Sequence, residues 1–90
     1  MSYRFSEIAA AQLDALDAEN PDAFEDVMDL IDAITDEPGG VRATADIIAT
    51  AEGPRFKNFV TGRYPLAVFW SDHPADGPRI EAIFPHPAHR

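Results

Sequence analysis

The chain has 90 residues and a formal net charge of −9, from seven basic and sixteen acidic side chains. This length predicts one domain, residues 1–90, whose small core leaves no room for a large cleft, and the absence of cysteine excludes disulfides, thiol nucleophiles and cysteine-type zinc sites. No apolar run approaches the ~20 residues of a membrane span and Met1–Arg4 begins no signal peptide, so we expect a cytoplasmic protein.

The first half of the chain predicts two helices. Tyr3–Phe5 is long enough only for a short strand, and Ser6 is a good N-cap for a helix over about Glu7–Asp17, where apolar residues recur at helical spacing. Asn20-Pro21 ends this helix and starts another, because asparagine caps well and proline is tolerated at the first helical position. Pro38-Gly39-Gly40 stops the second helix.

The second helix is predicted to be amphipathic. Its apolar stripe is expected to face the core and consists of Phe24, Val27, Met28, Ile31 and Ile34. Its far face carries four carboxylates, Glu25, Asp29, Asp32 and Asp36. The first half therefore predicts an αα-hairpin with an acidic outer surface.

The second half changes to strand patterns. Ala43–Thr50 fits either a short helical turn or an irregular strand. Arg55–Val60 alternates between polar and apolar residues, and Tyr64–Trp70 is apolar on both faces, as expected for a central strand. Pro65 cannot donate a hydrogen bond to a neighbouring strand, so we expect it at the start of its strand or at a bulge.

A loop over Asp72–Pro78 and a last strand over Ile80–Phe84 complete the predicted order, β-αα-βββ. The expected fold class is α+β, with a helical hairpin packed on one face of a small antiparallel sheet.

The charge is divided between the two halves of the chain. Residues 1–40 hold one base and eleven acids, a net charge of −10, whereas residues 41–90 hold six bases and five acids, a net charge of +1, with all three histidines. An acidic balance normally speaks against nucleic-acid binding, which depends on clustered lysine and arginine. Here the acidity belongs to the helices, so it does not exclude an anion-binding site on the sheet.

Segments from the whole chain carry a family resemblance. They are the starting strand Tyr3-Arg4-Phe5, a hairpin with AAAQLDAL and IDAITDEPGG, and the stretches RFKNFVTGRYPLAVFW and RIEAIFPHPAHR. The last two look like an Arg-bearing strand, a Tyr-Pro strand rich in hydrophobic residues, and a terminal strand ending in His with Arg shortly after. Together these segments resemble the RelE/ParE superfamily of bacterial toxins from type II toxin-antitoxin systems.

The resemblance implies two possible activities. The RelE-like branch cleaves mRNA, usually on the ribosome, with basic side chains on the sheet and a Tyr or His near the C-terminus. The ParE-like branch inhibits DNA gyrase without known hydrolytic chemistry. Both are held by an antitoxin segment that wraps the toxin, so the implied state is a hetero-oligomer with a cognate antitoxin, without a cofactor.

The candidate residues for RNA cleavage follow from its chemistry. Metal-free cleavage needs a base for the 2′-hydroxyl, an acid for the leaving oxygen and cations for the phosphate. The candidates are Arg55, Lys57, Arg63 and His86. Two residues apart on one strand, Arg55 and Lys57 point to the same face, which either meets a phosphate or is simply solvated. Pro65 stands at the strand position where ribonuclease members of the family place an arginine, and Arg63 lies next to that strand.

The histidines and aromatic residues each have two interpretations. His86 is either an acid-base group or a surface residue without a role. His73, His86 and His89 do not predict a metal site, because no carboxylate has matching spacing and nearby prolines disfavour a helix. Tyr64, Phe69 and Trp70 either stack on bases or belong to the core.

Three functions stay open on the sequence. The first, which we expect, is a ParE-like toxin that acts by protein-protein binding, and the second is a RelE-like, metal-independent mRNA endonuclease, so the residues do not decide whether the protein is an enzyme. The third is a degenerate, non-toxic interaction module. The acidic hairpin predicts an antitoxin with a basic segment. The predicted partner-binding residues are Glu25, Asp29, Asp32, Asp36 and Arg90.

Overall fold

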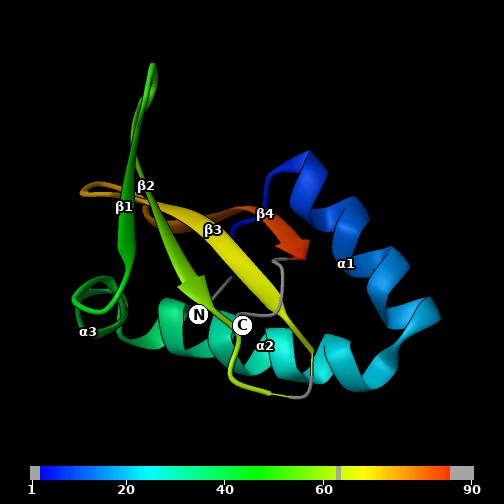
Figure 1. Ribbon diagram of the computed structural model, residues 1–90. Helices are drawn as coiled ribbons and strands as arrows, with labels where there is room; N and C mark the ends of the chain where they lie inside the picture. The colour runs from blue at the N-terminus through cyan, green and yellow to red at the C-terminus, as the bar shows by residue number, and fades with distance from the viewer. Residues whose placement is uncertain (1–2, 63, 86–90) are drawn as a thin grey trace.

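A computed structural model describes residues 3–62 and 64–85. Its elements are α1 (Glu7–Glu19), α2 (Pro21–Asp36), α3 (Pro38–Arg42), β1 (Asp46–Thr50), β2 (Gly53–Phe59), β3 (Leu66–His73) and β4 (Gly77–Pro85). The protein is thus α+β, with N-terminal helices packed on a four-stranded antiparallel sheet (Figure 1). No helix in the described ranges is long and apolar enough to cross a membrane.

The two long helices begin where their caps predict. The Ser6 hydroxyl accepts a hydrogen bond from the Ala9 N–H at 3.0 Å, and α1 runs two residues beyond its predicted end, to Glu19. The Asn20 side chain accepts from the Ala23 N–H at 3.3 Å, and Pro21 is the first residue of α2. Local capping chemistry therefore fixes the helical hairpin.

The second helix stops as predicted, but a third helix follows where the sequence indicated only a break. α2 ends at Asp36, and Glu37 joins it to α3. Pro38 takes the first position of α3, which proline favours, because its fixed φ suits a helix and its missing N–H would have no partner there. The residues that end one helix therefore start the next.

The predicted order β-αα-βββ is wrong, and the observed order is ααα-ββββ. Tyr3–Phe5 forms no named strand, and only an isolated parallel bridge joins Phe5 to Ile80. Ser6 already caps α1, so the chain turns into the helix directly after Phe5 and the pairing with β4 does not continue. The extra strand is β1, which settles the ambiguous stretch Ala43–Thr50: its last five residues are a strand because they pair with β2.

The strands form a meander in the order β1-β2-β3-β4, every neighbouring pair antiparallel. Pro65 lies just before β3, as its missing N–H predicted. The loop expected over Asp72–Pro78 is shorter, because β3 continues to His73 and β4 begins at Gly77. Figure 1 shows the β1–β2 hairpin projecting away from the helices, while α1 and α2 cover the sheet toward β3 and β4.

The core lies between the helical hairpin and the sheet. Its largest fully buried side chains include Trp70, Ile31, Ile34, Val27 and Val68. The Trp70 indole N–H donates to the Asn58 side-chain oxygen at 2.8 Å, and the Asn58 amide donates to the Val41 carbonyl at 3.2 Å. Trp70 therefore belongs to the core, and its polar atom is satisfied by a chain of bonds that reaches α3.

Candidate functional site

The face of the sheet away from the helices carries the two described candidates for anion binding. Arg55 and Lys57 lie on this face of β2, opposite Ile48 and Asp46 of β1. The Arg55 guanidinium lies 3.8 Å from the Glu52 carboxylate, and the Lys57 ammonium lies 3.9 Å from that of Asp46. Both carboxylates are largely exposed, so each pair contributes about 0–1 kcal/mol and leaves the cation available to another anion.

Aromatic side chains lie beside these cations. Phe59 and Phe84 are 49% and 46% exposed. The Phe69 and Phe84 rings meet edge to face at 5.4 Å, and the Lys57 ammonium lies 5.1 Å from the centre of the Phe59 ring. Cations next to exposed aromatic faces can hold a phosphate and a stacked base, or an acidic protein segment with aromatic anchors.

A polar cluster that the sequence patterns did not predict lies at the far end of the same face. The buried Ser71 hydroxyl donates to the Glu81 carboxylate at 2.6 Å and lies 3.3 Å from His73 Nε2. A hydroxyl has one proton, so Ser71 accepts from the imidazole rather than donating to it. A nucleophilic serine needs the reverse, so the cluster orients His73 and does not activate Ser71.

Arg79 stands opposite Ser71 in the register of β3 and β4. Its guanidinium makes no ion pair or side-chain hydrogen bond with the residues that the structure describes. Phe69 pairs with Ala82 and Trp70 with Ile80, so Glu81 is an extra residue of β4, and this bulge brings its carboxylate within reach of Ser71. Arg79 and His73 were not among the predicted anion-binding residues, because the sequence placed His73 in a loop and Arg79 just before the last strand, whereas both lie on strands.

Three predicted residues lie outside the described part of the chain: Arg63, His86 and Arg90. The structure therefore brings Arg55 and Lys57 to one face and places no other predicted catalytic residue relative to them. Within residues 3–62 and 64–85, no group of three or more His, Asp or Glu side chains is arranged to hold a metal ion.

The acidic stripe of α2 is exposed along its whole length. Glu25, Asp29, Asp32 and Asp36 follow one another at helical spacing, and none forms an ion pair with a base in the described ranges. The Asp32 carboxylate accepts a hydrogen bond from the Tyr3 hydroxyl. This bond, and the negative charges of Asp32 and Asp36, raise the pKa of Tyr3 above its usual 10.0. The stripe is thus a strong negative field that no base among the described residues neutralises.

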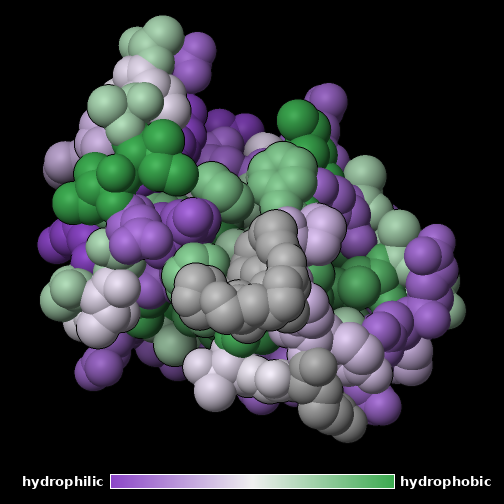
Figure 2. Space-filling model, viewed as in Figure 1, coloured by the Kyte–Doolittle hydropathy of each residue, from purple (hydrophilic) through white to green (hydrophobic). Residues whose placement is uncertain are grey.

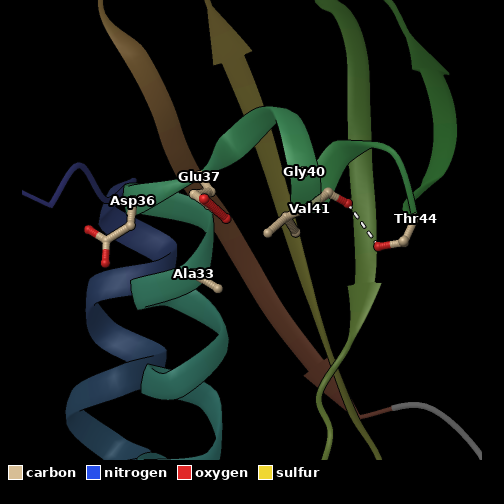
Figure 3. Close-up of a pocket in the computed structure, with 6 residues that line it drawn as sticks. All are labelled: Ala33, Asp36, Glu37, Gly40, Val41 and Thr44. Carbon is tan, nitrogen blue, oxygen red and sulfur yellow. Dashed lines mark hydrogen bonds between the residues drawn. The ribbon is translucent and has the colours of Figure 1, made fainter.

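A shallow hollow of about 670 Å³ lies where α2, α3 and the start of β1 meet (Figure 3). It is lined by Ala33, Asp36, Glu37, Gly40, Val41 and Thr44. The Thr44 hydroxyl donates to the Val41 carbonyl at 3.0 Å, which holds the floor of the hollow, and the Asp36 carboxylate points away from both residues (Figure 3). The hollow joins the acidic end of α2 to the edge of the sheet.

The fold and these surfaces define the class of protein: a small α+β domain with an acidic helical side and a sheet side that carries cations and exposed aromatic rings. Comparison with known proteins found no matching family model, no matching curated protein and no matching solved structure. A functional assignment therefore depends on the residues of this chain.

Proposed function

We propose that this protein is the toxin of a type II toxin-antitoxin system, a ParE-like growth inhibitor that acts through protein-protein binding and is neutralised by a cognate antitoxin. The observation that carries the proposal is the exposed acidic stripe on α2, which forms no ion pair within residues 3–62 and 64–85 and lies on the side of the molecule opposite the open sheet face. One side then binds the neutralising partner while the other meets the target. The resemblance of the strand segments to the RelE/ParE superfamily supports the same function.

The acidic stripe predicts the chemistry of the neutralising partner. A segment rich in lysine and arginine gains attraction from several carboxylates at once, and this raises the association rate more than it raises the affinity. Salt screens such attraction, because the Debye length falls from about 30 Å at 0.01 M to about 10 Å at 0.1 M. An antitoxin should therefore bind fastest at low ionic strength.

The first test is expression in a bacterial host. Induction should arrest growth, and co-expression of the small reading frame adjacent to the gene should restore it. The double variant Asp29→Lys/Asp36→Lys should stay toxic but escape neutralisation. The matched control Asp17→Lys/Glu19→Lys makes the same charge change on α1 and should still be neutralised. Normal growth on induction of the folded protein would overturn the proposal and leave a non-toxic interaction module.

A second candidate function is favoured by the open sheet face. Arg55 and Lys57 lie on that face, and the exposed Phe59 is the last residue of the same strand, an arrangement suited to a single-stranded RNA backbone and its bases. In that case the protein is a metal-independent mRNA endonuclease, with Arg55, Lys57, Arg63 and His86 as its working residues. A gyrase inhibitor leaves transcripts intact and blocks DNA supercoiling, so transcript mapping and a supercoiling assay separate the two functions.

The variants Arg55→Ala and His86→Ala sharpen this comparison. For an endonuclease, loss of an acid-base group or a phosphate contact lowers the cleavage rate by about 10²–10⁴-fold. Transcripts that are cut equally fast by both variants would remove these residues from the mechanism. Intact transcripts in arrested cells would exclude the endonuclease.

A further inference from the structure

The extra strand β1 forms an unprotected edge of the sheet. It pairs with β2 on one side, and on its other side it pairs with no strand in the described ranges. All five of its residues are exposed, with Ile47 at 68% and Ile48 at 36%. Natural edge strands are usually blunted by lysine, proline or a bulge, and the β1 sequence DIIAT has none of these. Figure 2 shows the most hydrophobic colour gathered over this strand, below the tip of the hairpin.

The register indicates which peptide groups face the free edge. Ala49 stands opposite Pro54, and a proline has no N–H with which to complete a hydrogen-bonded pair. In an antiparallel ladder the residues of the other kind of pair turn both their N–H and C=O outward. The peptide groups of Ala49 and, by alternation, Ile47 therefore point away from β2 and offer donors and acceptors to an added strand.

One end of this edge opens into the acidic hollow. Thr44 lines the hollow and lies two residues before β1. Asp36 and Glu37 also line it, whereas none of its lining residues is basic (Figure 3). A chain lying along β1 and continuing past Asp46 would thus pass from an apolar edge to the acidic end of α2, where Glu37 lines the hollow and the Asp36 carboxylate points away from Thr44.

We propose that the free edge of β1 binds an extended segment of a partner protein as a fifth strand, with apolar residues beside Ile47 and Ile48 and basic residues over the hollow. Main-chain hydrogen bonds would hold the segment, and the carboxylates would set its orientation. The charge argues against a second copy as the occupant, because each copy carries −9 and its own β1, DIIAT, has no base to place over the hollow. The inference rests on the proposed function only in taking this partner to be the antitoxin.

The test uses the full-length protein and synthetic peptides. Each peptide alternates valine with threonine and carries two lysines, at its C-terminus in one peptide and at its N-terminus in the other. In an antiparallel complex the C-terminal lysines reach the hollow, and in a parallel complex the N-terminal ones do. Titration into ¹⁵N-labelled protein should shift backbone amide resonances of residues 41–50. The tighter-binding peptide should bind at least about tenfold more tightly than the same peptide with glutamates in place of its two lysines, and equal affinity of these two would overturn the inference.

Three controls separate the components of binding. Ala49→Pro removes an outward donor at a position where an edge strand tolerates proline, and it should abolish binding without changing the circular dichroism spectrum. If that variant does not fold, the same peptide N-methylated at alternate residues gives the equivalent test on the unaltered protein. Asp36→Lys/Glu37→Lys should weaken binding about tenfold, and Asp17→Lys/Glu19→Lys by less than about twofold.

The opposite results are equally clear. Resonance shifts that leave both residues 41–50 and the lining of the hollow unchanged, or equal binding of the N-methylated peptide, would overturn the inference. So would a dimer of the free protein that Ala49→Pro converts to a monomer, because the edge would then bind a second copy. Binding at β1 by a protein that does not arrest growth would reject the toxin function and leave this inference standing, whereas growth arrest without these shifts would do the reverse.

Discussion

Replacing Asn58 with alanine should strongly destabilise the protein although it removes only a small polar side chain. Asn58 is buried at 7% exposure, and its oxygen accepts from the indole N–H of Trp70, which is fully buried. Its amide donates to the Val41 carbonyl at 3.2 Å and to the Thr44 hydroxyl at 3.3 Å. The substitution therefore breaks the bonds that tie β2 to β3 and to the start of β1.

The size of the effect follows from which groups can find water. The Trp70 N–H is left without an acceptor in the core, at a cost of about 1–3 kcal/mol. Thr44 is exposed and Val41 half-buried, so water reaches them and losing their bonds costs about 0.5–1.5 kcal/mol. The expected loss is about 2–4 kcal/mol, a large share of the 5–15 kcal/mol that stabilises a typical domain.

Urea unfolding followed by circular dichroism measures this loss. A double-mutant cycle with Trp70→Phe isolates the Trp70–Asn58 hydrogen bond. When residue 70 is phenylalanine, Asn58→Ala leaves no buried indole N–H without an acceptor. We expect a coupling energy of at least about 1 kcal/mol. A loss below about 0.5 kcal/mol in Asn58→Ala, or strictly additive single variants, would refute the assignment of this bond as a structural tie.

Two further predictions concern other contacts. A methyl group added by Gly62→Ala would lie 2.6 Å from Asp26 Cγ and 3.0 Å from its Cβ. The free energy of unfolding in urea should therefore fall by about 1–3 kcal/mol, and by less in an Asp26→Ala background. An equal loss in both backgrounds would place the clash elsewhere. The Tyr3–Asp32 hydrogen bond raises the pKa of Tyr3, so it stabilises the fold below pH 10.0 and this contribution is lost as the pH rises through the folded-state pKa. Ultraviolet titration in a Tyr64→Phe background should show a lower Tyr3 pKa in Asp32→Asn, and an unchanged value would mean that the bond is not made in solution.

The helices could be predicted from the sequence because their signals are local. Ser6, Asn20 and Pro21 each act on the backbone within one turn, so their chemistry is visible in the residue order. The strand state of Asp46–Thr50 is different, because pairing with β2 decides it and the segment alone fits two structures. The same limit applied to Tyr3–Phe5, whose partner Ile80 lies near the other end of the chain.

Some of the candidate surfaces could also be predicted from the sequence, and others could not. The α2 stripe follows from helical periodicity, and the shared face of Arg55 and Lys57 follows from strand alternation. The contact between Ser71 and Glu81 depends on a bulge in β3 and β4, and a bulge changes the register without a recognisable local pattern. Arg63, His86 and Arg90 lie outside the described residues, so their predicted roles stay predictions.

The bridge between Phe5 and Ile80 has a consequence for how the protein is made. The Ser6 N–H bonds the Ile80 carbonyl, and the Ser6 hydroxyl bonds the Glu81 carbonyl, so the start of α1 is held by the last strand. During synthesis these partners are the last part of the sheet to leave the ribosome. The helical hairpin therefore emerges first and keeps its apolar stripe uncovered until β4 arrives, and a chain truncated before Ile80 should remain open and prone to aggregate.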